Sequence, residues 1–162
     1  MSSDEGMRSR PGGRKDGVHV FAVRVYFEDT DAGGVVYYAN YLKFAERART
    51  EMLREFGIEH LQMMDEEGRV FVARCCVAEF MKSARIDDLL EVHTRLLSVS
   101  GAALDLAQDV KRQGATLVTL RLGLACITVS GRATRIPPAL RSTLNELLAT
   151  EQAVRLNGKQ RN

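Results

Sequence analysis

Near the start of the chain, hydrophobic residues alternate with polar ones, and this pattern then changes to a helical one. Residues 18–27 are mostly Val and aromatic residues, and from residue 21 every second position is apolar, as in a half-buried strand. The residues on the apolar face are Phe21, Val23, Val25 and Phe27. In residues 40–56 the spacing is helical, and one apolar stripe contains Tyr41, Ala45, Ala48, Met52 and Phe56. Asn40 is expected to cap this helix, and Gly57 stands where a C′ glycine belongs.

Strand patterns fill most of the remaining chain. After a linker at residues 60–68, the alternation predicts four strands, at residues 70–81, 89–98, 103–112 and 117–129. The turns at Ser100 and Gly101 and at Gln113 and Gly114 are too short for parallel crossovers, so the sheet should be antiparallel. Pro137 and Pro138 end this region, and residues 139–148 are expected to form a short helix. The pattern predicts an α+β fold whose sheet curls around the long helix.

Length and charge limit the classes of protein to consider. The 162 residues predict one domain at residues 18–150, between a disordered N-terminal tail (1–17) and a polar C-terminal tail (151–162). Because 23 Lys and Arg face 21 Asp and Glu, the net charge is only +2, and no nucleic-acid partner is expected. Uncharged apolar stretches reach only about ten residues, so no membrane span is expected. Three cysteines without a CxxC motif, and no signal peptide, favour the cytoplasm.

The most unusual segment, residues 26–41, places three acids before two glycines and a helix start. The acids are Glu28, Asp29 and Asp31, and the glycines are Gly33 and Gly34. Free N–H groups at a helix N-terminus favour negative charge and can polarise a carbonyl. A nearby carboxylate can attack that carbonyl or activate water. The segment therefore indicates acyl transfer, and the alternative is a capped turn whose acids are merely solvated.

Other chemistries fit the sequence less well. The acids resemble the start of a calcium loop, but Gly33 and Asn40 stand where two further oxygen ligands are required. The sequence has no phosphate-binding glycine motif, no GxSxG and no HExxH. The histidines His19, His60 and His93 have no ligand spacing. We therefore expect neither a metal nor a cofactor.

Two charged residues interrupt the apolar side of the predicted helix. Arg49 falls within the stripe, and Glu46 lies at its edge, three residues earlier. One interpretation is a half-buried ion pair between them, or partners in adjacent strands or subunits. The other is that Glu46 reaches a binding site on the buried side.

Two longer segments resemble a known family. They are RVYFEDTDAGGVVYYANYLKFAERARTEMLR (residues 24–54) and AEFMKSARIDDLLEV (residues 78–92). Both resemble hotdog-fold acyl-CoA thioesterases of the 4-hydroxybenzoyl-CoA thioesterase family, in particular the YbgC branch associated with the Tol–Pal system. The resemblance implies a five-stranded antiparallel sheet wrapped around a long central helix. It also implies edge-to-edge dimers, commonly dimers of dimers, with active sites between subunits.

The resemblance also implies roles for individual residues. Asp31 matches the family's nucleophile or general base, and Tyr26 matches an aromatic residue before the acids. The backbone N–H that polarises the thioester maps onto Tyr38 and its neighbours. The YbgC branch usually has a histidine where this chain has Tyr38, so an imidazole proton donor is not expected here. The remaining residues expected to contact the substrate are Gly33, Gly34, Val35, Val36 and Glu46, with Lys82, Arg85, Arg132 and Arg135 as candidates for the CoA phosphates.

The resemblance therefore predicts an enzyme that converts an acyl-CoA to a carboxylic acid and CoA. An acyl carrier protein is a second candidate carrier of the acyl group, and the chain is expected to form a homo-oligomer. The alternative is a hotdog protein that binds acyl thioesters without hydrolysis, or a scaffold of the cell-envelope Tol–Pal machinery.

Overall fold

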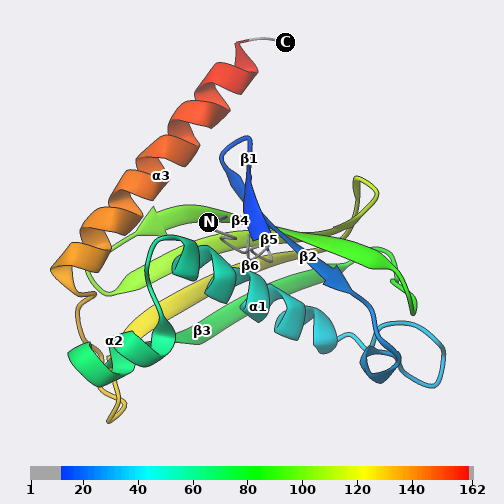
Figure 1. Ribbon diagram of the computed structural model, residues 1–162, viewed down its shortest axis with the longest axis horizontal. Helices are drawn as coiled ribbons and strands as arrows, with labels where there is room; N and C mark the ends of the chain where they lie inside the picture. The colour runs from blue at the N-terminus through cyan, green and yellow to red at the C-terminus, as the bar shows by residue number, and fades with distance from the viewer. Residues whose placement is uncertain (1–11, 161–162) are drawn as a thin grey trace, which may run out of the picture.

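The computed structural model describes residues 12–160 and shows an α+β fold (Figure 1). The predicted fold class is confirmed. Within the described residues, no helix is both long enough and apolar enough to span a membrane. In chain order the elements are β1 (Gly12–Lys15), β2 (Val18–Arg24), the short 3₁₀ helix η1 (Phe27–Asp29), α1 (Asn40–Glu55), α2 (His60–Glu67), β3 (Arg69–Phe80), β4 (Leu89–Val99), β5 (Ala103–Arg112), β6 (Ala115–Thr128) and α3 (Pro138–Lys159).

The strands form one sheet in the order β1-β2-β4-β5-β6-β3. Every neighbouring pair is antiparallel, as the short turns predicted. The five expected strands are present, and β1 adds a sixth at one edge. The other edge is β3, which is twelve residues long and, within residues 12–160, pairs only with β6.

Helix α1 lies across one face of the sheet and supplies the centre of the core (Figure 1). Its apolar side is fully covered: Phe44 is 1% exposed and Ala45 and Ala48 are 0% exposed. These side chains pack against inward-facing residues of four strands, among them Val23, Leu90, Val110 and Leu120. The predicted stripe therefore sets which side of the helix faces the sheet.

The two ends of α1 differ from each other in how well they were predicted. Gly57 has a φ of 76° and donates its N–H to the Arg54 carbonyl at 2.9 Å, so the predicted C′ glycine is confirmed. The predicted cap at Asn40 is wrong, because Ala39 occupies the N-cap position. The Asn40 side chain instead donates to the Asp29 carbonyl at 2.8 Å. Asn40 therefore ties the acidic turn to the start of the helix.

Several predicted tails and linkers are ordered elements. Residues 12–15, expected in the N-terminal tail, form β1, because its backbone pairs with β2 despite a sequence of low strand propensity. Residues 1–11 of that tail lie outside the described residues. The predicted linker 60–68 contains α2, which ends at Gly68 in the left-handed conformation. The predicted short helix extends to Lys159, so residues 151–159 are helical rather than a polar tail.

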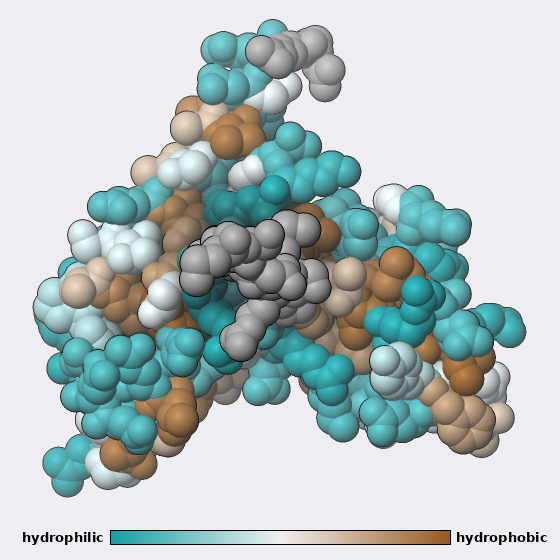
Figure 2. Space-filling model, viewed as in Figure 1, coloured by the Kyte–Doolittle hydropathy of each residue, from teal (hydrophilic) through white to brown (hydrophobic). Residues whose placement is uncertain are grey.

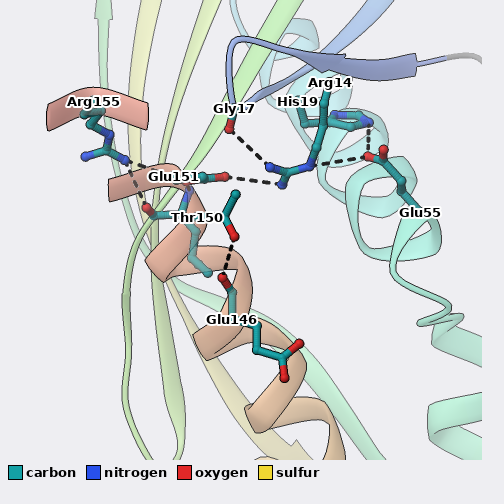
Figure 3. A network of polar contacts seen from close by, with 9 residues as sticks. Arg14, Gly17, His19, Glu55, Glu146, Thr150, Glu151 and Arg155 are labelled. Carbon is teal, nitrogen blue, oxygen red and sulfur yellow. Dashed lines mark hydrogen bonds and ion pairs between the residues drawn. The ribbon is translucent and has the colours of Figure 1, made fainter. Parts of the chain in front are cut away.

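A buried polar network joins β1, α1 and α3 (Figure 3). Arg14 lies between two acids, 3.4 Å from Glu151 Oε1 and 4.0 Å from Glu55 Oε2. Glu151 also accepts the Leu96 N–H at 2.9 Å. His19 stands 3.8 Å from the Glu55 carboxylate, and burial together with Arg14 lowers its pKa to about 4. These contacts explain why α3 continues past the predicted end of the domain.

Candidate active site

The acidic segment folds into a tight turn directly before α1. Thr30 and Val36 form an isolated antiparallel bridge that closes the turn. Asp29 is a structural residue within it: its carboxylate accepts the Tyr26 N–H at 2.8 Å. The Asp29 carbonyl accepts the Tyr37 N–H at 3.0 Å. Together with the Asn40 contact, these bonds hold the turn against the N-terminus of α1, which is called the helix mouth below.

Asp31 stands at the tip of this turn and is exposed. Its N–H donates to the Val35 carbonyl at 2.9 Å, and its carbonyl accepts the Gly34 N–H at 3.0 Å. Its Oδ1 accepts the Gly33 N–H at 2.8 Å, whereas Oδ2 accepts no hydrogen bond from residues 12–160. One carboxylate oxygen is therefore held in place, and the other has no hydrogen-bond partner within the described residues.

The positions of Gly33 and Gly34 each require glycine, for different structural reasons. Gly34 has a φ of 76°, which side-chain-bearing residues rarely adopt. A Cβ at Gly33 would lie only 3.1 Å from Asp31 Oδ1. Both glycines therefore preserve the position of the Asp31 carboxylate.

The residues directly before α1 have free backbone donors. The N–H groups of Asn40 and Tyr41 bond to the carbonyls of Tyr37 and Tyr38. Within the described chain, the N–H groups of Tyr38 and Ala39 donate no hydrogen bond. Free amides at a helix N-terminus carry partial positive charge and suit an oxyanion. The predicted pairing of the Asp31 carboxylate with these amides stays a prediction.

Exposed aromatic residues surround this mouth. Tyr38 is 60% exposed, and its ring lies edge-on to Phe80 with centroids 6.0 Å apart. Tyr26 is 62% exposed at the start of the turn. Figure 2 shows apolar surface among hydrophilic side chains at this end of the molecule, on the right of the view. Phe80 was missed from the sequence because only the folded sheet brings the end of β3 beside the helix; its place at the end of a strand pattern was the available signal.

The loop between β3 and β4 lies against the acidic turn. Val36 is buried and donates its N–H to the Ala84 carbonyl at 2.9 Å, and Val35 bridges to Arg85. The Arg85 N–H donates to the Asp88 carboxylate at 2.9 Å, and this bond is the main cause of a lowered Asp88 pKa. Lys82 lies in the same loop, two residues after Phe80. Of the four residues predicted to contact the CoA phosphates, Lys82 and Arg85 therefore lie in the loop that contacts the acidic turn.

Arg132 and Arg135 lie at the other end of the sheet. The Arg135 carbonyl accepts from Arg69, the first residue of β3, at 2.7 Å. Phe80, beside Tyr38, is the last residue of β3. A strand of this length spans roughly 35 Å at about 3.3 Å per residue. Within one chain, these two arginines are not brought together with Asp31.

Glu46 is also separate from the helix mouth. It is exposed on the side of α1, about 9 Å along the helix axis from Asn40. With Arg49 it lines a cavity of about 480 Å³ between α1 and β3. Within residues 12–160 the two form no salt bridge, and Arg49 instead donates to Gln108 Oε1 at 2.9 Å, so the expected ion pair within one chain is absent. Among residues 12–160 there is no cluster of three or more His, Cys, Asp or Glu side chains suited to a metal ion.

Comparison with known proteins gives consistent matches. A model of the thioesterase-like superfamily matches residues 25–144. The acyl-CoA thioesterase YbgC of Haemophilus influenzae is 42% identical over 107 residues, which cover 66% of this chain and 79% of that protein. The acyl-CoA thioester hydrolase YbgC of Escherichia coli O6:H1 is 47% identical over 96 residues, covering 59% and 71%. The crystal structure of a probable thioesterase from Bartonella henselae superposes with a TM-score of 0.72 at 38% identity, covering 74% of this chain and 99% of that one.

Proposed function

The chain belongs to the thioesterase-like superfamily and is an acyl-CoA thioester hydrolase, and we propose that Asp31 and the helix-mouth amides carry its chemistry. Hydrolysis would release a carboxylic acid and CoA. The observation that supports this assignment is the Asp31 carboxylate, whose Oδ1 is held by the Gly33 N–H while Oδ2 has no partner in the described residues, in the turn that leads to the unbonded N–H groups of Tyr38 and Ala39. A thioester needs little acid catalysis because thiolate is a good leaving group.

In the proposed reaction, the thioester oxygen accepts hydrogen bonds from the Tyr38 and Ala39 amides. Each such donor is worth about 3 kcal/mol to an oxyanion transition state. In one route Asp31 removes a proton from water, the water oxygen bonds to the carbonyl carbon, and the C–S bond breaks. The departing thiolate then takes the proton from Asp31. In the other route an Asp31 carboxylate oxygen bonds to the carbonyl carbon, and the C–S bond breaks to release CoA as its thiolate. Water then hydrolyses the resulting anhydride to the carboxylic acid and the Asp31 carboxylate, and the proton set free by this hydrolysis goes to the thiolate.

We assign the surrounding residues to substrate binding. Tyr26 and Tyr38 would contact the acyl group and the pantetheine arm through exposed aromatic surface. Lys82 and Arg85 would face the CoA phosphates from the same chain. This arrangement also suits an acyl group on a carrier protein, because the pantetheine arm is common to both.

Arg132 and Arg135 would reach the CoA of a neighbouring subunit. If two copies pair their free β3 edges antiparallel, the Arg69 end of one strand meets the Phe80 end of the other. The arginines of the second copy then lie near the helix mouth of the first. We therefore propose a homodimer as the smallest complete enzyme.

The test is thiol release from short, long and aromatic acyl-CoAs by Asp31→Asn and Asp31→Ala. Turnover should fall at least about 100-fold, the usual scale for a lost catalytic carboxylate. Glu28→Gln is the matched control, since this exposed acid makes no hydrogen bond or ion pair in the described chain, and it should keep wild-type turnover. Wild-type rates in both Asp31 variants would remove Asp31 from the mechanism.

Two further outcomes separate this proposal from its alternatives. Tight binding of acyl-CoA without thiol release by the wild-type chain would favour the non-hydrolytic alternative. Activity should also survive EDTA, because the proposed steps use only a carboxylate and backbone amides. A large loss that added metal restores would indicate metal-dependent chemistry instead.

A further inference from the structure

Asn40 is a buried polar residue between the acidic turn and the helix mouth. It is only 9% exposed, although asparagine is usually found at the surface of a protein. A buried side-chain amide costs free energy unless it is hydrogen-bonded. The Asn40 Nδ2 donates to the Asp29 carbonyl at 2.8 Å. Because Ala39 rather than Asn40 holds the N-cap position, this contact does not cap the helix, and its role lies in the acidic turn.

The Asp29 carbonyl receives two donors, which lie on either side of the free amides. One donor is the Tyr37 N–H at 3.0 Å, and the other is the Asn40 side chain. The N–H groups that are unbonded in the described chain belong to the two residues between these donors, Tyr38 and Ala39. The segment that carries the free amides is therefore joined at both of its ends to one oxygen atom of the acidic turn.

The same carbonyl is close to Asp31 along the chain. Only Thr30 separates Asp29 from Asp31, and Thr30 is bridged to Val36 across the turn. The Asp31 N–H donates to the Val35 carbonyl at 2.9 Å. The turn is therefore closed by its own hydrogen bonds, and the Asp29 carbonyl is the point at which it is bonded to the helix mouth.

The next residue of α1 makes an equivalent contact with a different loop. Tyr41 is 3% exposed, and its hydroxyl accepts the Ala84 N–H at 3.0 Å. Ala84 belongs to the loop between β3 and β4. Asn40 and Tyr41 thus each hold one loop through a buried side chain. Tyr41 therefore provides a matched comparison, because its hydrogen bond starts from the same helix turn and does not involve Asp29.

We propose that Asn40 is a positioning residue for hydrolysis, which holds the Asp31 carboxylate in register with the helix-mouth amides. This inference rests on the proposed function of Asp31. The Asn40 side chain acts through the acidic turn rather than on the substrate. Without its hydrogen bond, only the Tyr37 N–H joins the Asp29 carbonyl to the helix mouth, and the carboxylate can shift relative to the amides. A misplacement of about 1 Å can lower a rate constant about 100-fold.

A double-mutant cycle with Asp31 tests this role, with single-turnover thiol release as the readout. Asn40→Ala should lower the rate constant about 10- to 100-fold, while the Kd for CoA stays within about twofold of the wild-type value. If Asn40 acts through the Asp31 carboxylate, its removal has little effect once that carboxylate is gone. In the Asp31→Asn background, Asn40→Ala should therefore lower the rate constant less than about threefold. Losses that multiply in the double variant would overturn the proposal, because a general structural defect acts with or without the carboxylate.

The same cycle separates this inference from the proposed function. A wild-type rate constant in Asp31→Asn would overturn both of them. A slow Asp31→Asn together with a wild-type rate constant in Asn40→Ala would leave the role of Asp31 standing and overturn only the positioning role of Asn40.

Tyr41→Phe is the matched control, since it removes a buried hydrogen bond from the same turn of α1 without affecting a contact of Asp29. It should lower the urea midpoint about as much as Asn40→Ala does, and it should keep the rate constant within about threefold of the wild-type value. A Tyr41→Phe variant as slow as Asn40→Ala would show that any lost buried contact at this turn slows the reaction, which contradicts a specific role of Asn40.

If Asn40→Ala does not fold, Asn40→Asp replaces it in the cycle. Aspartate keeps the size of the side chain and adds a charge that favours a helix N-terminus, but it cannot donate to the Asp29 carbonyl when ionised. The rate constant should still fall at least about 10-fold. A wild-type rate constant in Asn40→Asp would show that the donor is not required, and the positioning role would then be wrong.

Discussion

The buried Glu151 carboxylate should be the main anchor of the extended helix α3. Glu151 is 2% exposed and accepts the Leu96 N–H at 2.9 Å (Figure 3). Its removal in Glu151→Ala leaves that buried amide unsatisfied, which costs about 1–3 kcal/mol. It also leaves Arg14 with only Glu55 nearby, and breaking a buried pair costs about 3–5 kcal/mol. Burial raises the pKa of Glu151, so the carboxylate is itself costly to bury, and we expect a net loss of about 3 kcal/mol.

Urea unfolding at a fixed protein concentration measures this loss. The midpoint should fall for Glu151→Ala, and the melting temperature should drop by about 6–12 °C. Glu151→Gln keeps an acceptor for Leu96 and should lose about 1–2 kcal/mol. Glu146→Ala is the matched control on the exposed side of the same helix and should stay within about 0.5 kcal/mol. The reasoning would be refuted if Glu151→Ala were as stable as Glu146→Ala.

Three further predictions concern the buried histidine and the acidic turn. Because the pKa of His19 is lowered from 6.5 to about 4, its neutral form stabilises the fold at high pH. That contribution, at most about 3 kcal/mol, should disappear as the pH falls from 6.5 through about 4, and unfolding of His19→Gln should lack this pH dependence. Gly33→Ala should lower kcat about 10- to 100-fold by displacing the Asp31 carboxylate, whereas Gly101→Ala, with open space around it, should not. Tyr38→Phe should keep kcat within about threefold in the thiol-release assay, since only its backbone is assigned to the oxyanion.

Local pattern was enough to predict most of the fold. Strand β5 was predicted at residues 103–112, the range it occupies, because alternation and two flanking turns define it. Strand β1 was missed because Gly12 and its neighbours have little strand propensity, and only β2 and the contact of Arg14 with Glu151 hold them. The second half of α3 was missed because its local sequence is polar. It is held by a long-range contact, in which the buried Glu151 reaches β4.

The candidate site divides in a similar way. Asp31, its two glycines and the start of α1 are close in sequence, so they could be grouped into one candidate site before the fold was known. Phe80 and the bond from Arg49 to Gln108 join residues that are far apart in sequence, and they depend on strand order. Arg132 and Arg135 were grouped with the site by resemblance. Within a single subunit, however, they lie near the first residue of β3, at the opposite end of this strand from Phe80. Only a second subunit would bring them to the substrate.

The most direct test of the central claim is single-turnover thiol release, with enzyme in excess over an acyl-CoA that the wild type hydrolyses. This experiment isolates bond breaking from substrate binding and product release. The rate constant for Asp31→Asn should be at least about 100-fold below the wild-type value, while the Kd for CoA stays unchanged. An undiminished rate constant in that variant would show that another group performs the chemistry.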